Sequence, residues 1–444
     1  MALLLRFAIP MMIGNLFQQM YNVVDAAVIG RFVGGNELGG IGATGSIHYL
    51  IFSLGYGMAS GIGIRIGMLF GAGEDKRVTR AIYNSFYVLL GAALLITLLG
   101  ACGADAILKL MQTPEEVFPH AVQYLRVCML GSGATLLYAG ISGMMRALGD
   151  SKTPLYILIA ACLLNIGLDC LFVLVWHWNV FGVALATIVA QAFAAVLSYV
   201  LARRTFSLFA PTKDALRPDR KLILSCMRLG LPIAGQNGLI ALSCIVLQVA
   251  VNGFGHHVVT AFTAVSQMDQ LIQQPYGSLS ASMSAYAAQN IGAGKPKRVR
   301  EGLRASAGCM IVFTAAAFVL IRLFAREMLS LFVTDEAVME IALRAWRMTS
   351  LFYPFLGLSY VVRGTLNGLG DSIYAGMNGV IEFVCRICMA KPLTLLPGVG
   401  LYGCFLCSCF TWMITGVLSF LRYQFGRWDP EKRRRKNDAT VVGP

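Results

Sequence analysis

The sequence predicts an all-α membrane protein with twelve transmembrane helices in two pseudo-symmetric six-helix lobes. Three observations predict this fold class: a repeated sequence, a very apolar composition and an alternation of charge between successive loops. Of the 444 residues, 57% are hydrophobic and 13% are charged. A soluble domain carries about 25% charged residues. The charges here must therefore lie in loops, with long apolar stretches between them.

The chain repeats itself at a fixed offset. Residues 71–78 read GAGEDKRV and residues 292–299 read GAGKPKRV, while LGDS occurs at 148–151 and again at 369–372. Both pairs are 221 positions apart, and a shared offset at separated points indicates an internal duplication. Each copy is mostly apolar. Duplicated membrane bundles are typical of secondary transporters, in which the substrate site lies between the repeats.

Twelve apolar stretches follow one another along the chain, each long enough to span a bilayer, for which about 20 residues suffice. They cover residues 7–31, 41–70, 81–104, 119–146, 153–176, 181–203, 225–252, 258–291, 301–325, 340–367, 372–397 and 399–424. Six spans fall in each copy, and because six is even, the two repeats are parallel. The predicted organisation is an N-terminal lobe, a cytoplasmic connector, a C-terminal lobe and a basic cytoplasmic tail, at residues 1–203, 204–224, 225–424 and 425–444.

Basic residues cluster in alternate loops. They gather around residues 76–80, 146–152, 203–221 and 295–304 and in the tail, whereas the intervening loops hold few of them. This pattern follows the positive-inside rule and places both termini in the cytoplasm. It explains the net charge of +14 without a nucleic-acid partner, and the tail is expected to contact anionic lipid headgroups.

Other kinds of chemistry find little support in the sequence. Nearly all of the 12 cysteines lie inside apolar spans, where a free cysteine behaves as a small hydrophobe; Cys385 and Cys388 form a CxxC, but within a helix. The two glycine-rich loops lack the spacing of a phosphate-binding loop and follow no buried strand. His48 lies inside a span and has no evident partner for enzyme chemistry. We therefore expect no enzyme and no cofactor beyond a coupling ion.

Polar residues inside the spans are the candidate functional residues, because a charge in hydrocarbon is costly. In the first span, Asn15, Gln18, Asn22 and Asp25 recur at steps of three and four and share one helix face. Such a face must line a cavity or pack on another helix. Pro10 lacks an N–H and marks a weak point in the same helix, fifteen residues before the acid.

A second group lies on the fifth and sixth spans. Asn165 and Asp169 are four residues apart and share a face, and Thr187 lies at a comparable depth on the next span. With Asp25 they offer two carboxylates, an amide oxygen and a hydroxyl. Oxygen ligands of this kind suit a small cation such as Na⁺, and the carboxylates would equally carry a proton. The alternative interpretation is a hydrogen-bonded packing network that holds no ion.

The second copy lacks this group. The positions 221 residues after Asn165 and Asp169 hold Arg386 and an alanine. Instead, Asp269 lies in mid-helix among glutamines, and Glu382 lies four residues before Arg386, which suggests an internal ion pair or a static packing pair. We therefore expect ion coupling in the first copy, and substrate contacts or gating in the second.

Four segments resemble the multidrug and toxic compound extrusion (MATE) family, and together with the duplication they cover nearly the whole chain. They read FAIPMMIGNLFQQMYNVVDAAVIGRF, MRALGDSKTP, LLNIGLDCLFV and SMSAYAAQNIGAGKP. The resemblance implies two six-helix lobes that form a V-shaped cleft. It also implies antiport, in which bulky and often cationic amphiphilic compounds are exported in exchange for Na⁺ or H⁺.

The resemblance also assigns residues. The first-helix acid of the family matches Asp25, the fifth-helix pair matches Asn165 and Asp169, and the sixth-helix hydroxyl matches Thr187. Pro10 matches the proline at which helix 1 is thought to bend in some members. One branch of the family carries an acid on helix 7, and this chain has none there. No cation site is therefore predicted in the second lobe.

The substrate cavity is expected to be apolar and aromatic with few charges, as ligand sites generally are. Its candidate residues are Phe17, Gln18, Met20, Tyr21, Asn22, Tyr138, Gln267, Asp269 and Gln274. For each aromatic residue, ordinary helix packing is the alternative. The expected partners are small organic molecules and membrane lipid, and the chain is expected to be a monomer in the bacterial inner (cytoplasmic) membrane.

Two rival functions remain at this stage. A flippase for lipid-linked oligosaccharides would share the two-lobe architecture, but it would need a cationic cavity for pyrophosphate, and Arg386 is nearly the only deep base in the sequence. A membrane-embedded enzyme would need a constellation of histidine and cysteine or metal ligands at depth, and the sequence offers none.

Overall fold

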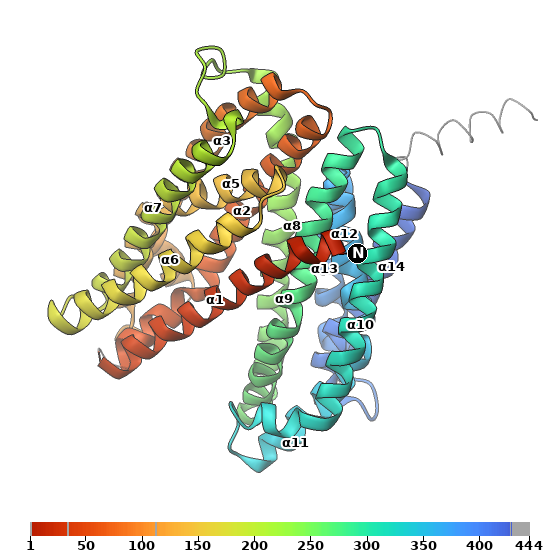
Figure 1. The fold of residues 1–444 in the computed structure, drawn as a ribbon. Helices are drawn as coiled ribbons and strands as arrows, with labels where there is room; N and C mark the ends of the chain where they lie inside the picture. The colour runs from red at the N-terminus through yellow and green to blue at the C-terminus, as the bar shows by residue number, and fades with distance from the viewer. Residues whose placement is uncertain (1, 33–34, 112, 427, 429–444) are drawn as a thin grey trace, which may run out of the picture. The chain divides into compact units, whose positions relative to one another are not determined.

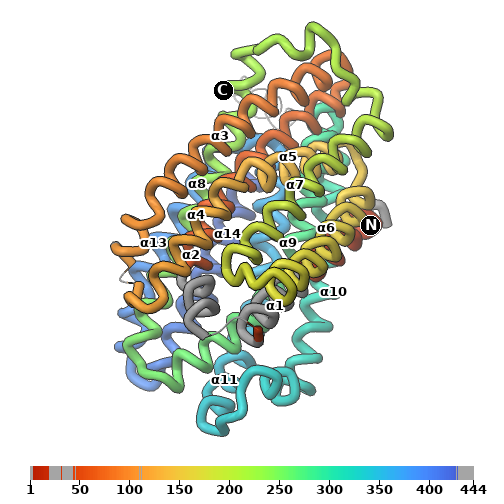
Figure 2. The backbone as a smooth tube through the Cα atoms, turned by 90° about the vertical axis from the view of Figure 1, so that its left-hand side faces the viewer, coloured from red at the N-terminus to blue at the C-terminus, as the bar shows by residue number. Residues whose placement is uncertain are grey.

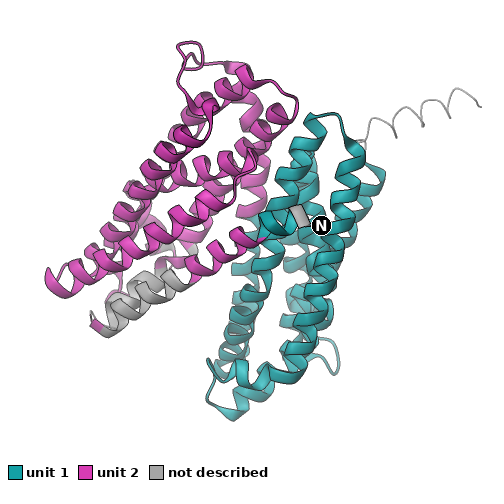
Figure 3. Cartoon of the chain, viewed as in Figure 1, with its two compact units in different colours: residues 1–8, 239–444 teal, residues 9–238 magenta. Residues whose placement is uncertain are grey.

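The computed structural model describes residues 2–32, 35–111, 113–426 and 428, without the side chains of residues 2–3, 20–31, 35–43, 46 and 110. Every regular element in this part of the chain is a helix (Figure 1). By packing, the chain divides into unit 1, residues 1–8 and 239–444, and unit 2, residues 9–238 (Figure 3). This division falls inside two helices, whereas the lobe boundaries expected from the sequence fall in loops, so those boundaries stay a prediction.

Unit 2 begins within the first helix and ends within α8. Its elements are α1 (Ala2–Phe32) from Ile9 onward, α2 (Gly35–Gly71), α3 (Asp75–Leu110), α4 (Phe118–Leu130), α5 (Ser132–Ala147), α6 (Lys152–Asp169), η1 (Cys170–Val175), α7 (Asn179–Thr205), η2 (Ser207–Phe209) and α8 (Arg220–Asn252) up to Gly238. The predicted span 119–146 is two helices, α4 and α5, with a 48° bend between them. Gly131 at the bend allows close packing, because a Cβ there would lie 2.3 Å from Ile188 Cγ1.

Unit 1 repeats this order. It contains the rest of α8, then α9 (His256–Gly292), α10 (Pro296–Leu329), α11 (Glu336–Thr349), η3 (Ser350–Phe352), α12 (Tyr353–Gly368), α13 (Ser372–Thr394), η4 (Gly400–Tyr402) and α14 (Gly403–Phe425). The predicted span 340–367 is likewise broken, at η3, and Phe352 lies 221 positions after Gly131. The core of unit 1 surrounds Trp346, Tyr276 and Tyr353, which are among its largest fully buried side chains.

The helices have the length and surface of membrane spans. Each of the twelve predicted spans falls on one helix or on consecutive helices. In the described part of the chain, eight helices are long and apolar enough to cross a membrane, and the bent pair α4–α5 would be a ninth. Leu98 and Leu99 of α3 are 53% and 63% exposed, and their repeat equivalents in α10, Val319 and Leu320, are 53% and 51% exposed. Large apolar side chains so exposed in both repeats fit a lipid-facing surface, and the prediction of an all-helical membrane protein is confirmed.

The duplicated turns have the same backbone geometry in both units. Gly73 and Gly294 follow α2 and α9 with φ of 73° and 69°, and Gly149 and Gly370 follow α5 and α12 with φ of 100° and 77°. Each pair is 221 positions apart. A left-handed glycine after a helix ends it by satisfying its last carbonyls. These loops are therefore helix stops, as the sequence predicts.

The duplication also repeats a close helix contact. In unit 2, α5 packs on α2, and in unit 1, α12 packs on α9 (Figures 1 and 2). A Cβ on Gly143 would lie 3.4 Å from the carbonyl oxygen of Ala59, and a Cβ on Gly364 would lie 2.3 Å from that of Ser280. Both residues of the second pair lie 221 positions after those of the first. Small residues let membrane helices approach this closely.

The connector between α7 and α8 is anchored on α3. The hydroxyl of Tyr83 donates to the carbonyl of Phe209 at 2.6 Å, and that of Tyr87 donates to the carbonyl of Leu216 at 2.7 Å. Between them, the buried Asn84 amide accepts from the backbone N–H of Asp219 at 2.6 Å. The connector is therefore an ordered segment at one end of unit 2.

Candidate functional site

A buried polar pair lies at the C-terminal end of α6. Asn165 is 1% exposed and Asp169 is 0% exposed, one helical turn apart on the side of α6 that faces the interior of unit 2. Helix α7 packs against α6 and carries Thr187, which is partly buried and donates to the carbonyl of Val183 at 3.1 Å. None of these three side chains lacks a partner. The structure thus buries the carboxylate and the amide together on α6, and their role as cation ligands with Thr187 stays a prediction.

Four of the predicted site residues lie outside the described side chains. Asp25, the proposed second carboxylate, and Met20, Tyr21 and Asn22 of the proposed cavity fall within the range of α1, and nothing is described of their side chains. The four-residue cation site and this part of the cavity therefore stay predictions.

The helix changes geometry directly after Asp169. Residues Cys170–Val175 form a π-helix, and π-helical turns occur frequently at functional sites. Beyond it, Trp176 stacks on Phe172 with ring centroids 5.2 Å apart, and Trp178 lies 4.8 Å from Trp176. Hydropathy along the span does not predict this turn; its only signal in the sequence is the density of aromatic residues in the loop.

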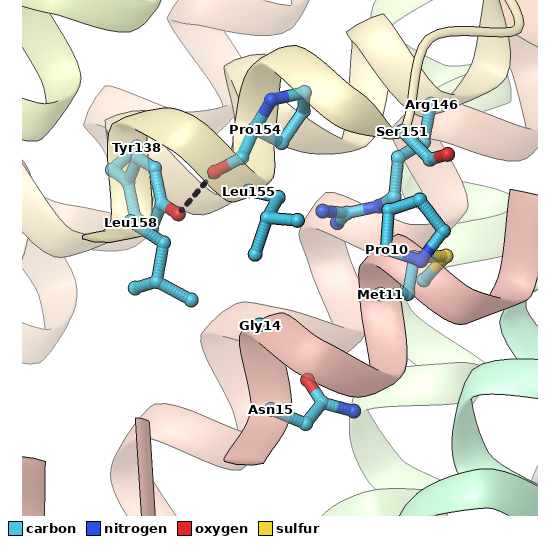
Figure 4. A pocket seen from close by; sticks show the side chains of 10 residues that line it. All are labelled: Pro10, Met11, Gly14, Asn15, Tyr138, Arg146, Ser151, Pro154, Leu155 and Leu158. Carbon is cyan, nitrogen blue, oxygen red and sulfur yellow. Dashed lines mark hydrogen bonds between the residues drawn. The ribbon is translucent and has the colours of Figure 1, made fainter. Parts of the chain in front are cut away.

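A pocket in unit 2 brings together Pro10 and Tyr138, two residues that the sequence analysis placed in different roles (Figure 4). Its volume is about 340 Å³, including open space at its mouth. It is lined by Pro10, Met11, Gly14, Asn15, Tyr138, Arg146, Ser151, Pro154, Leu155 and Leu158. The Tyr138 hydroxyl donates to the carbonyl of Pro154 at 3.5 Å. The guanidinium of Arg146 makes the pocket basic. The charge pattern assigns Arg146 to a loop, whereas it lies in the last turn of α5.

Two further predicted cavity residues of α1, Phe17 and Gln18, do not line this pocket. Pro10 itself is buried within an unbroken helix, so the proposed bend at Pro10 stays a prediction. Phe17 and Gln18 are partly buried, and Gln18 hydrogen-bonds with Tyr56 of α2. These residues and Tyr138 belong to unit 2, whereas Gln267, Asp269 and Gln274 belong to unit 1. The prediction of one cavity formed by all of them is untested.

In unit 1, Asp269 is held by aromatic donors. The hydroxyl of Tyr353 donates to Asp269 Oδ1 at 2.6 Å, and Trp346 Nε1 donates to the same hydroxyl at 2.9 Å. Gln267 is exposed and Gln274 is partly buried. The neighbouring Gln273, which the sequence analysis did not assign to the cavity, accepts a hydrogen bond from Tyr360 at 3.0 Å.

Of the two interpretations of Glu382 and Arg386, the direct ion pair is wrong, whereas a packing pair stays a prediction. Glu382 Oε1 instead lies 3.5 Å from Nη1 of Arg363 on α12. Arg386 Nη1 donates to Ser243 Oγ at 2.5 Å and to Cys244 Sγ at 3.0 Å, both on α8. The two residues share a face of α13 and attract each other through space, but their direct contacts come from two other helices. Arg363 is also a second deep base, which the sequence analysis overlooked.

Comparison with known families agrees with the duplication. The sequence profile of the MatE family matches the chain twice, over residues 10–171 and 232–390. The two matches begin 222 positions apart and together cover well over half of the chain.

Individual relatives extend over nearly the whole length. The "Probable multidrug resistance protein YpnP" of Bacillus subtilis (strain 168) is 30% identical over 434 residues, which are 97% of this chain and 96% of that protein. The "FAD transporter" of Shewanella oneidensis is 24% identical over 428 residues, 94% of this chain and 93% of that protein. A solved structure described as "Crystal structure of MATE in the bent conformation" matches with a TM-score of 0.89 at 20% identity, covering 99% of this chain and 97% of that one, and shows a shared fold.

Proposed function

The chain belongs to the MATE family, and we propose that it is a secondary active antiporter that exports amphiphilic, often cationic organic compounds in exchange for Na⁺ or H⁺. Family membership makes it a multi-pass membrane transporter of small molecules and not an enzyme. The direction of transport, the coupling ion and the alternating-access cycle belong to the proposal.

The single observation that carries the proposal is the buried carboxylate of Asp169 inside a membrane span. Asp169 is 0% exposed, one turn from the equally buried Asn165, in a helix that continues to Val175 as one span. An acid at this depth is costly and marks ion pathways in membrane proteins. Binding of Na⁺ or a proton would neutralise it, and Thr187 and Asp25 are the proposed further ligands.

Coupling follows if the cation and the compound prefer opposite conformations. A ligand shifts a conformational equilibrium only by its differential affinity for the two states. In the proposed cycle, neutralising Asp25 removes its preference for a wet position, and α1 repacks around Pro10. That movement closes the substrate cavity on one side and releases the compound.

The names of the relatives do not agree on the compound transported. One relative is named for multidrug resistance and another for FAD, so relatives of similar length differ in the compounds given in their names. The alternative function considered above, a flippase for lipid-linked oligosaccharides, has no support from these relatives. We further propose that the chain works as a monomer in the bacterial cytoplasmic membrane, with both termini in the cytoplasm.

The coupling ion is tested by dye efflux in inverted membrane vesicles, with a Na⁺ gradient and a pH gradient imposed separately. One of the two gradients is expected to drive accumulation of a cationic dye. Equal accumulation with and without either gradient would contradict antiport.

Asp25→Asn and Asp169→Asn test the proposed site in the same vesicles. Each is expected to lower gradient-driven transport by about 5- to 150-fold, the range of typical coupling energies, while the protein stays folded and monodisperse. Asp214→Asn is the matched control, because the Asp214 side chain is 90% exposed in the connector. Full gradient-driven transport by Asp25→Asn would refute the role of that carboxylate.

A further inference from the structure

Unit 1 buries two arginines and one glutamate close together. The side chains of Arg363 and Glu382 are 15% and 7% exposed, and Arg386 is 6% exposed. Two positive groups and one negative group leave this cluster with an excess positive charge. Asp269, the acid of α9, is engaged by the hydroxyl of Tyr353.

The contacts of each group show where the excess charge lies. The guanidinium of Arg363 stacks on the ring of Tyr360 at 4.6 Å and reaches Glu382 at 3.5 Å. Arg386 donates to Ser243 and Cys244, a hydroxyl and a thiol, and its Nε is buried without a hydrogen-bond partner. Among the described residues, no carboxylate contacts Arg386 directly; Glu382, one turn earlier on α13, attracts it only at longer range and is shared with Arg363.

A buried charge without a counter-charge is expensive, and a guanidinium matches the geometry of carboxylate or phosphate oxygens with two parallel hydrogen bonds. Arg386 retains such donors, because only Nη1 has a described acceptor. The cluster also reaches the surface of unit 1. Cys244, which contacts this guanidinium, is exposed, and Arg363 is partly exposed.

We propose that Arg386 and Arg363 form a binding site on unit 1 for an oxyanion, the carboxylate or phosphate group of a transported organic compound. The proposal rests on the proposed transport function and makes its substrate class more specific: the compounds that bind unit 1 carry an anionic group, as zwitterions or organic anions. Glu382 competes with the substrate for Arg363 and so limits the affinity of the site.

The test uses two dyes that differ only in the anionic group. Rhodamine B carries a free carboxylate, and its ethyl ester carries none. Binding of each dye to the purified full chain in phosphatidylcholine nanodiscs is measured by fluorescence polarisation, without an ion gradient. The readout is the ratio of the two affinities, which is insensitive to general loss of folded protein.

Arg386→Gln and Arg363→Gln are each expected to weaken the binding of rhodamine B about tenfold relative to the binding of its ethyl ester. This factor corresponds to the loss of one charged hydrogen bond. Glu382→Gln is expected to shift the ratio in the opposite direction by several-fold, because it removes the competing carboxylate. Arg344→Gln is the control, since Arg344 is an exposed arginine of the same unit that stacks on Tyr402 at 4.8 Å. It should leave the ratio unchanged.

Three outcomes would overturn the assignment. The first is failure of the unmodified chain to bind rhodamine B. The second is equal weakening of both dyes by the arginine variants, which would show a structural role. The third is loss of the difference between the dyes in phosphatidylglycerol nanodiscs, which would assign the site to a lipid headgroup. Failure of gradient-driven transport with an intact affinity ratio would contradict antiport alone, so the two proposals fail separately.

Discussion

Asp269 illustrates how a partly buried acid is accommodated by hydrogen bonds, since no basic side chain among the described residues pairs with it. Its oxygen accepts from Tyr353, whose hydroxyl in turn accepts from Trp346. Both aromatic side chains are 0% exposed. Each donor in this series of hydrogen bonds polarises the next, which makes such networks sensitive to the loss of any member. We interpret the Asp269–Tyr353–Trp346 network as a structural support of the core of unit 1.

Tyr353→Phe is expected to destabilise the protein by about 1–3 kcal/mol, because it leaves the Asp269 carboxylate and the Trp346 N–H without this partner. The measurement is thermal unfolding in detergent. Tyr374→Phe is the control, since the buried Tyr374 hydroxyl bonds to the uncharged Ser419 hydroxyl at 2.7 Å; it should cost about 1 kcal/mol. Equal effects of the two variants would argue against a special role for the Asp269 network.

At this scale the sequence predicts which residues are polar and buried, but not whom they contact. The spacing of Asn165 and Asp169 places them on one face, and the structure buries both. The spacing of Glu382 and Arg386 also places them on one face, yet their partners come from α12 and α8. The helical period predicts which residues share a face of one helix. It does not predict which residues of other helices they contact.

At the scale of helices, the close contact between α9 and α12 depends on Gly364, which has no side chain. Gly364→Ala would place a Cβ 2.3 Å from the backbone oxygen of Ser280, so the helices must separate. We expect a loss of about 1–3 kcal/mol, as for other overpacked cores, measured by thermal unfolding. Gly277→Ala on α9 is the control, because its Cβ would meet only Tyr360 Cε1 at 3.9 Å; it should be neutral or stabilising by up to about 1 kcal/mol. A neutral Gly364→Ala variant would show that the contact tolerates a methyl group.

The anchoring of the connector on α3 is a second helix-scale feature. Asn84→Ala removes the acceptor of the Asp219 N–H and leaves buried backbone groups unsatisfied, which costs about 1–3 kcal/mol. We expect faster trypsin cleavage after Lys213 and Arg220, with the transmembrane helices intact. Ser85→Ala is the control, because the Ser85 hydroxyl bonds to the carbonyl of Ala81 in its own helix. Unchanged cleavage of the Asn84 variant would mean that the tyrosine contacts alone hold the connector.

The sequence predicts the helices far better than the breaks within them. All twelve apolar stretches become helices, but nothing in the pattern separates α4 from α5 or α11 from α12. Hydropathy reports the environment along a stretch, and a break depends on what packs beside it, as Ile188 does beside Gly131. The π-helix after Asp169 is missed for the same reason.

For the molecule as a whole, the duplication and the charge pattern jointly predict orientation. The connector and the turns after α2 and α5 carry the basic residues of unit 2, and the intervening loops carry few. Because the positive-inside rule acts through these loops, the connector should face the cytoplasm, and the loop between α3 and α4 should face the outside.

Lys213→Cys and Glu116→Cys test this orientation, since both positions are exposed, one in the connector and one in the loop between α3 and α4. They are introduced after alanine replaces the exposed native cysteines Cys102, Cys244 and Cys388. A membrane-impermeant maleimide is expected to label Lys213→Cys in inverted vesicles and Glu116→Cys in right-side-out vesicles. Labelling of both positions from the same side would contradict an odd number of spans between them, here α4–α5, α6 and α7. Exchange of the two patterns would instead place the termini outside, and the basic loops would then lie on the side that the rule forbids.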